Sequence, residues 1–216
     1  MSPRTKGYAY EGPRGKIQMH SSWEVKVARI LDELQLTWIY EPRKFRTSAG
    51  GFIPDFWIDE AACYLEVKGY EHANAAEKLA AFRQEYPYEL VVVRDINWLG
   101  MAYMVQRLYQ LCLGVRYREL TPEDRLEQIR RNVLRAYQEI GELLEATPWK
   151  WHRVYENHEI DTSNLLEEFG DLFVFMLNII AVVGLRESDV MAAVHDVHLK
   201  NFERLREGVN QKEMGS

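Results

Sequence analysis

The hydrophobic pattern changes its period once along the chain, and this change constrains the fold more than any other feature of the sequence. Up to about residue 100, short apolar runs such as FIPDFWID, CYLEVKG and ELVVVRD stand among two helical patterns, SSWEVKVARILDELQL and NAAEKLAAFRQEY. This mixture predicts an α/β domain with a small mixed sheet and flanking helices. Later in the chain no strand pattern returns, and helices are predicted over roughly 101–113, 122–146, 162–183 and 187–207. The second part is therefore predicted to be an all-α helical bundle.

Two domains preceded by an arm are expected. The 216 residues suffice for two small domains, each with its own core. Residues 1–20 are rich in Gly, Pro and basic residues and are predicted to form a flexible basic arm, followed by an α/β domain over 21–115 and an all-α domain over 119–210. Up to residue 118 there are 16 basic and 14 acidic residues, whereas the remainder has 11 and 19. This difference in charge favours different ligands for the two domains.

The sequence indicates neither a membrane segment nor an oxidising compartment. The longest apolar run, LFVFMLNIIAVVGL, is too short to cross a bilayer and has no signal-peptide flank. Cys63 and Cys112 fit neither a disulfide framework nor a metal-binding spacing. We therefore expect a cytoplasmic protein that does not bind membranes.

A first group of chemically active residues lies in the stretch GGFIPDFWIDEAACYLEVKGYE. Asp55 lies at a strand end, and Glu66 and Lys68 share one face of the next strand because they are two positions apart. If the strands pair, two carboxylates and an ammonium converge, and Mg²⁺ would relieve the repulsion between the carboxylates. The lysine would orient or help to deprotonate a water that attacks phosphorus. The same residues also fit an exposed cross-strand pair beside a turn-capping aspartate.

These motifs resemble the PD-(D/E)xK nuclease signature. The chain has PDF, eleven residues from Asp55 to Glu66, and EVK, while SSWEVKVARIL, YEPRKF and KGYEHANAAEKLAAF are similar to phage endonuclease I-type junction resolvases and related small phage nucleases. The resemblance covers roughly residues 20–100 and implies that Asp55 and Glu66 bind metal. It also implies that Lys68 serves the nucleophile and that Glu24, in the first helix, completes the site. No feature of the sequence establishes the intertwined dimer or the branched DNA substrate of those resolvases.

Basic residues of this part of the chain are candidates for contacts with the phosphates of DNA. They are Arg4, Lys6, Arg14, Lys16, Arg43, Lys44 and Arg46. Any one of them also fits an ordinary solvated charge. An N-terminal domain that binds DNA without cutting it therefore remains an alternative to the nuclease.

A second group of carboxylates lies in the predicted helices. Glu139 and Glu142 are three positions apart and share a helix face, and Glu168 and Asp171 repeat this spacing. Four carboxylates on two facing helices would repel one another strongly unless cations lay between them. Paired acids on facing bundle helices can hold dinuclear metal sites, and the absence of a Glu-x-x-His motif argues against iron. Oxygen ligands alone favour Mg²⁺ or Mn²⁺.

The helical part also resembles a known superfamily. Its Glu-x-x-Glu and Glu-x-x-Asp pairs are followed by HLKNFERLRE, in which Lys200, Asn201 and Arg204 could neutralise a triphosphate. The pattern resembles the all-α NTP pyrophosphohydrolases, the superfamily of MazG-like enzymes and dimeric dUTPases, over about residues 121–207. It implies Mg²⁺-dependent hydrolysis of a nucleoside triphosphate to the monophosphate and pyrophosphate, with the metal held by Glu139, Glu142, Glu168 and Asp171.

The same resemblance implies further roles. Glu139 would take the proton of the attacking water, and Trp149 or Trp151 would stack on the base. The phosphates would be held by Lys150, Lys200 and Arg204, with Asn201 beside them. We expect dUTP or dCTP as substrate and a homo-oligomer, either a dimer or a tetramer.

Taken together, the two resemblances imply a bifunctional phage-type enzyme in the cytoplasm of an infected host cell. In the alternative, the helical part is only a dimerisation bundle for an active nuclease.

Overall fold

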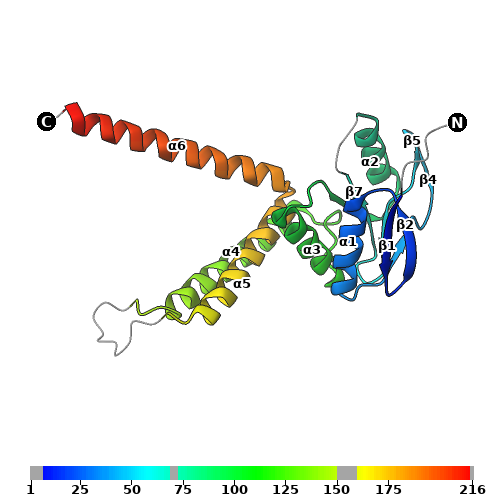
Figure 1. Ribbon diagram of the computed structural model, residues 1–216, viewed down its shortest axis with the longest axis horizontal. Coiled ribbons are helices and arrows are strands. Elements are labelled where there is room, and N and C mark those ends of the chain that lie inside the picture. Colours follow the sequence, from blue (N-terminus) through cyan, green and yellow to red (C-terminus); the bar gives the residue numbers. More distant parts are fainter. Residues whose placement is uncertain (1–6, 69–72, 150–159, 215–216) are drawn as a thin grey trace. The chain divides into compact units, whose positions relative to one another are not determined.

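The computed structural model describes residues 7–68, 73–149 and 160–214 of the chain. It divides into two compact units, Met1–Thr121 and Pro122–Ser216, called the N-terminal and the C-terminal unit below. The N-terminal unit combines strands and helices, and the described part of the C-terminal unit is helical (Figure 1). The coarse prediction of an α/β part followed by a helical part is therefore confirmed.

A mixed four-stranded sheet in the order β3-β6-β7-β8 is the centre of the N-terminal unit. Strands β3 (Trp38–Tyr40), β6 (Phe56–Ile58) and β7 (Cys63–Val67) are antiparallel neighbours, and β8 (Glu89–Val93) runs parallel to β7. All residues of β7 and β8 are buried, as expected for strands that are covered on both faces.

Three helices belong to the same unit, namely α1 (Ser22–Glu33), α2 (Ala73–Glu85) and α3 (Trp98–Cys112). Helix α1 begins after Ser21, whose side chain accepts a hydrogen bond from the backbone N–H of Glu24. Such a cap satisfies one of the N–H groups that a helix start leaves unpaired. Because the cap fixes the first turn of α1, it also fixes the position of Glu24.

The expected flexible arm is wrong for residues 7–20, and residues 1–6 lie outside the described part of the chain. Strands β1 (Tyr8–Gly12) and β2 (Gly15–Met19) form an antiparallel hairpin against α1. Tyr10 and Met19 are buried, and the hydroxyl of Tyr10 donates a hydrogen bond to Asp32. Gly and Pro mark a tight turn here rather than a flexible segment, because the neighbouring Tyr10 and Met19 pack into the core.

A second hairpin, formed by β4 (Phe45–Thr47) and β5 (Gly50–Phe52), covers part of the central sheet. Phe45 and Phe52 of this hairpin pack with Tyr64 of β7 and Phe82 of α2 in one buried cluster. The ring centres of Phe45 and Tyr64 are 5.1 Å apart and edge-on, a favourable aromatic arrangement. The hairpin and α2 therefore lie on the face of the sheet that Tyr64 occupies.

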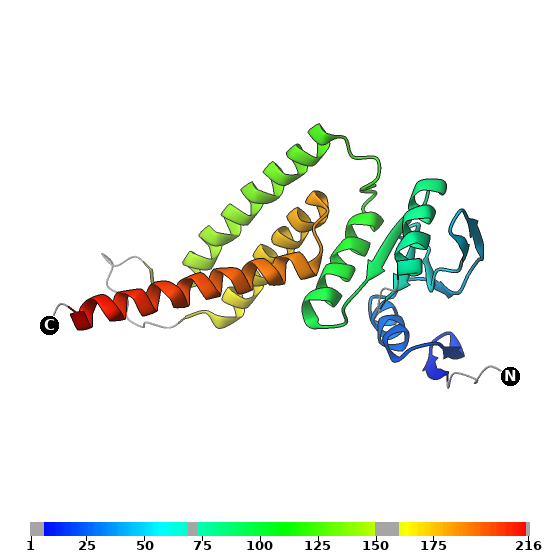
Figure 2. The ribbon, with the colours of Figure 1, turned by 90° about the horizontal axis from the view of Figure 1, so that it is seen from above.

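The C-terminal unit contains α4 (Pro122–Glu145), α5 (Thr162–Val183) and α6 (Glu187–Met214). Helices α4 and α5 pack side by side as an antiparallel pair (Figure 2). At one end the backbone N–H of Asp161 donates to Ala146 O at 3.1 Å, and at the other Arg125 donates to Val182 O at 2.5 Å. Between these ends, the side-chain amide of Asn178 donates to Asn132 Oδ1 at 3.1 Å, and both asparagines are buried.

Helix α6 departs from the predicted bundle. Every side chain from residue 191 to residue 206 is exposed, and these include Val194, Phe202 and Leu205. One chain therefore does not close the bundle that its sequence predicts. The sequence shows that α6 has an apolar face, but it does not say which chain covers that face.

Within the described residues, no single helix has the length and apolar character needed to cross a membrane. Helices α5 and α6 meet that test only as a pair, with a bend of 114° between them.

Candidate functional site

The pairing of β6 with β7 brings Asp55, Glu66 and Lys68 together. Phe56 is paired with Leu65, so Asp55, directly before β6, lies level with the end of β7. The backbone N–H of Val67 donates to Asp55 Oδ2 at 2.7 Å. Lys68 Nζ forms an ion pair with Glu66 Oε1. Two carboxylates and an ammonium thus meet at one end of the sheet.

Glu24 joins this group from the first turn of α1. It is buried, with 5% of its surface exposed. Its Oε1 accepts a hydrogen bond from Ser21 Oγ at 2.7 Å, and its Oε2 accepts from the backbone N–H of His20 at 2.9 Å and from the hydroxyl of Tyr40 at 2.6 Å. These donors hold the carboxylate in one orientation and leave Oε1 able to accept a further ligand. The charge of Glu24 also raises the pKa of Asp55 and of Glu66.

Tyr40 is a residue of this group that sequence reasoning missed. The alternation in WIY provides a signal, because it places Trp38 and Tyr40 on the inner face of β3 and Ile39 outside. Burial and the contact with Glu24 raise the pKa of Tyr40, so its hydroxyl stays protonated and donates to the carboxylate.

The raised pKa values of Asp55 and Glu66 indicate that the group formed with Glu24 and Lys68 carries more negative than positive charge. Burial, and then the neighbouring charge of Glu66, raise the pKa of Asp55 from 3.8 to about 8. Burial likewise raises the pKa of Glu66, although Lys68 opposes this. Burial alone would lower the pKa of Lys68, but the attraction of Glu66 and Asp55 outweighs it, so the pKa is raised and the lysine stays charged. Three carboxylates face one ammonium, and a proton or a metal ion must offset the excess.

One oxygen of Glu66 identifies where a cation fits. Glu66 is only 1% exposed, and its Oε2 has no hydrogen-bond partner among the described residues. A buried carboxylate oxygen without a partner costs free energy, which a divalent cation would offset. Asp55, Glu66 and Glu24 offer the hard oxygen ligands that Mg²⁺ and Mn²⁺ prefer. This burial is inconsistent with the alternative of an exposed cross-strand pair.

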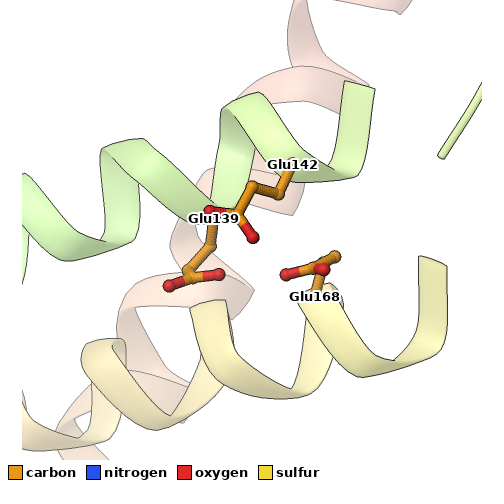
Figure 3. A group of neighbouring side chains, drawn as sticks. All are labelled: Glu139, Glu142 and Glu168. Carbon is orange, nitrogen blue, oxygen red and sulfur yellow. The ribbon is translucent and has the colours of Figure 1, made fainter. Parts of the chain in front are cut away.

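In the C-terminal unit, Glu139, Glu142 and Glu168 lie together. One carboxylate oxygen from each falls within 4.8 Å of the others. The three side chains point toward one another between α4 and α5 (Figure 3). The pKa of Glu168 is raised to about 7 by desolvation, by a hydrogen bond with Glu139 and by the charges of Glu142 and Glu139. Carboxylates this close share a proton or bind a cation.

The other predicted residues of the helical site that the structure describes lie on α5, after the end of α4 and on α6. Asp171 is exposed and is not part of the group of three glutamates. Trp149 is 45% exposed after the end of α4, and Lys150 and Trp151 lie outside the described residues. The side chains of Lys200, Asn201 and Arg204 are exposed on α6. Within the described ranges, neither Lys200 nor Arg204 forms an ion pair with the three glutamates.

The two groups of acidic residues are built in different ways. The first is buried, and a hydrogen-bonded frame fixes each carboxylate. The second depends on the approach of side chains from α4 and α5. No protein-family model matches the chain, and no curated protein or solved structure is significantly similar to it.

Proposed function

We propose that the protein is a bifunctional metal-dependent hydrolase whose N-terminal unit cleaves phosphodiester bonds of DNA. The observation that carries this proposal is the buried Glu66 Oε2 without a partner, beside Asp55 and the charged Lys68. A structural ion pair seldom leaves a buried carboxylate oxygen unsatisfied. The resemblance of PDF…EVK to PD-(D/E)xK nucleases, with Glu24 in the preceding helix, supports the same conclusion and a nuclease-like fold for this unit.

In this proposal each residue has one task. Asp55, Glu66 and Glu24 would hold Mg²⁺, or Mn²⁺, through their carboxylate oxygens. The bound metal would supply stabilisation of the charge that develops on the scissile phosphate. Because Lys68 remains an ammonium next to Glu66, it orients the attacking water or neutralises a phosphate oxygen rather than acting as a free base.

The C-terminal unit is proposed to hydrolyse a nucleoside triphosphate to the monophosphate and pyrophosphate. The approach of Glu139, Glu142 and Glu168 from two helices favours this second activity. These carboxylates, with Asp171, would hold Mg²⁺, and Glu139 would accept the proton of the attacking water. Trp149, Lys150, Lys200, Asn201 and Arg204 would bind the nucleotide, and dUTP or dCTP is the preferred substrate by resemblance.

A homo-oligomer, either a dimer or a tetramer, would complete the helical unit. Met191, Val194, Phe202 and Leu205 share one face of α6, and all four are exposed. An apolar stripe of this size on an isolated helix indicates an interface. A second copy of the chain would cover the stripe and bring its own α6 cations toward the acidic group.

We expect light scattering after size exclusion to give at least twice the chain mass of 25.4 kDa. The double substitution Val194→Glu/Phe202→Glu should give a monomer with unchanged helicity, because both side chains are exposed in one chain. A wild-type monomer at about 50 μM would contradict the proposed assembly.

One preparation of the full chain tests both activities with Mg²⁺ present. DNA cleavage is followed on supercoiled and branched substrates, and pyrophosphate release on a panel of dNTPs and NTPs. We expect both activities, and we expect EDTA to remove both. DNA binding without cleavage would reduce the N-terminal unit to a DNA-binding domain. Absence of pyrophosphate release with every nucleotide would reduce the helical unit to a dimerisation bundle.

A further inference from the structure

The structure describes five of the seven candidate phosphate-binding cations and separates them into two groups. Arg14 donates to Leu36 O at 3.0 Å, and its guanidinium lies 5.1 Å from the centre of the Trp38 ring. Lys16 pairs with Glu11 at 3.2 Å. Both are therefore engaged within their own hairpin and its neighbours, while Arg4 and Lys6 lie outside the described residues.

The other three cations are Arg43, Lys44 and Arg46, which lie on or directly before β4. All three are exposed, and none forms an ion pair within the described part of the chain. Lys44 and Arg46 are two positions apart and point from the same face of the strand. Arg43 lies over the Phe45 ring, with its guanidinium 5.1 Å from the ring centre.

Two lysines lie beside the glycines of β5. A Cβ on Gly51 would lie only 3.0 Å from Lys44 Cε, so Lys44 extends across the position where β5 lacks a side chain. A Cβ on Gly50 would lie 3.7 Å from Cε of Lys78, which comes from α2. Gly50 also has a φ of +108°, which a residue with a side chain rarely adopts. The hairpin thus carries cations along β4 and beside both exposed glycines of β5.

Hydrogen bonds hold this hairpin in place. The hydroxyl of Tyr86 donates to Arg46 O at 2.7 Å, and Thr47 Oγ1 donates to Gly50 O at 2.8 Å. At the turn, the backbone N–H of Ser48 donates to the carboxylate of Glu85 at 3.0 Å. Glu85 is therefore engaged with the turn. A surface that is already ordered loses little conformational entropy on binding.

The hairpin lies on the same sheet face as the candidate nuclease site. Tyr64 and Glu66 alternate onto one face of β7, and Tyr64 packs against Phe45 of β4 at 5.1 Å. Lys78 is one turn before Phe82 on α2, and the Phe82 ring is 5.8 Å from that of Tyr64. The hairpin and α2, which carries Lys78, therefore cover the sheet face on which strand alternation also places Glu66 and Lys68.

We propose that the β4–β5 hairpin, together with Lys78, binds the phosphate backbone of duplex DNA and presents it to the site at Asp55 and Glu66. This inference rests on the proposed nuclease function for the identity of its ligand. Lysine and arginine contacts to phosphates position a duplex without reading its bases, and two glycines offer no side chain for base contacts. Binding is therefore independent of sequence and strongly dependent on salt.

The test compares the full chain with the Lys44→Gln/Arg46→Gln variant in EDTA, which prevents cleavage. Fluorescence anisotropy with a labelled 20-base-pair duplex gives Kd at several salt concentrations. Each lost phosphate contact reduces the slope of log Kd against log salt by about 0.9, so we expect a reduction of about 2. At 0.1 M salt, Kd should rise roughly 10- to 60-fold.

The matched control is Arg29→Gln/Arg130→Gln, which removes two exposed cations from α1 and α4 and changes the net charge equally. It should leave Kd and the salt slope within about twofold of wild type. The proposal is overturned if the hairpin variant behaves like this control.

Failure of the hairpin proposal and failure of the nuclease proposal are distinguishable. If wild type cleaves DNA and the hairpin variant binds it normally, only the hairpin is misassigned. If the hairpin variant binds weakly but wild type cleaves no DNA, the hairpin proposal stands and the nuclease proposal fails.

Discussion

Replacing Asp55 by asparagine is expected to abolish DNA cleavage and, at the same time, to stabilise the metal-free protein. Cleavage should fall by at least about a thousandfold, because an amide is a poor ligand for Mg²⁺ compared with a carboxylate. Folding should be preserved, since an asparagine oxygen can still accept the hydrogen bond from Val67 N. Loss of function with a gain in stability distinguishes a strained metal site from a structural ion pair.

The gain in stability follows from the ionisation of Asp55. Its carboxyl loses its proton near 3.8 in the unfolded chain and near 8 in the folded protein. The folded state therefore binds the extra proton between these values, and the stability contributed by protonated Asp55 is full below pH 4 and is lost as pH rises to about 8. Asparagine carries no charge, so the variant should have a larger free energy of unfolding than wild type, by up to roughly 5 kcal/mol at pH 8 and by much less at pH 4.

Urea unfolding in EDTA at pH 4 and pH 8 measures this difference. The matched control is Asp59→Asn, which makes the same change just after β6 at an exposed aspartate that accepts a hydrogen bond from Trp57. The control should retain cleavage and should show no gain at pH 8. If Asp55→Asn keeps cleavage, Asp55 is not a metal ligand. If Asp55→Asn gains no stability at pH 8, repulsion between Asp55 and the neighbouring carboxylates does not destabilise the folded protein.

Replacing Glu142 by glutamine is expected to abolish pyrophosphate release while leaving DNA cleavage intact. Glu142 is exposed and faces Glu139 and Glu168, so the substitution removes a ligand without disturbing a core. Loss of one metal ligand should lower kcat/KM by roughly a hundredfold or more. Initial rates of pyrophosphate release, measured with the best nucleotide of the panel, give this ratio.

The pH dependence of pyrophosphate release by wild type gives an independent check on the group formed by Glu139, Glu142 and Glu168. Glu168 holds its proton up to about pH 7, and this proton occupies an oxygen that Mg²⁺ would need. Pyrophosphate release at limiting Mg²⁺ should therefore fall as pH is lowered through 7. The control Glu167→Gln changes the neighbouring glutamate, which is not part of the group and is the smallest of the causes that raise the pKa of Glu168. It should therefore keep the rate at pH 8 and shift the pH profile only slightly toward lower pH. Equal loss in both variants would indicate a general effect of acidic charge instead of a metal site.

The sequence predicts local structure well where periodicity and caps agree. The predicted helix 162–183 coincides with α5, which Asp161 caps at its start and Gly184, at a φ of +84°, ends. Glu66 and Lys68 could be grouped from the sequence because strand alternation determines which side chains share a face, and Asp55 joins them on the condition that its strand pairs with theirs, as β6 and β7 do. The contact between Tyr40 and Glu24 was not identifiable in this way, since it depends on how β3 packs against α1.

Other differences between the prediction from sequence and the structure also arise from tertiary packing. Residues 7–20 form a hairpin because α1 and Trp38 offer Tyr10 a buried position, which the local composition cannot reveal. The apolar face of α6 is visible in the sequence, yet a helical pattern does not specify whether its partner is the same chain or another. Both cases show that local patterns specify elements more firmly than they specify neighbours.

The buried Asn132–Asn178 pair determines which levels of α4 and α5 face each other. Glu142 follows Asn132 by ten residues, and Glu168 precedes Asn178 by ten, so in an antiparallel pair these glutamates stand opposite each other. Sliding one helix by a turn would break the hydrogen bond between these two buried amides and would separate the carboxylates. The unit should therefore tolerate substitutions along this stretch far better than a single inserted or deleted residue, because the number of residues between amide and acid determines whether the carboxylates meet.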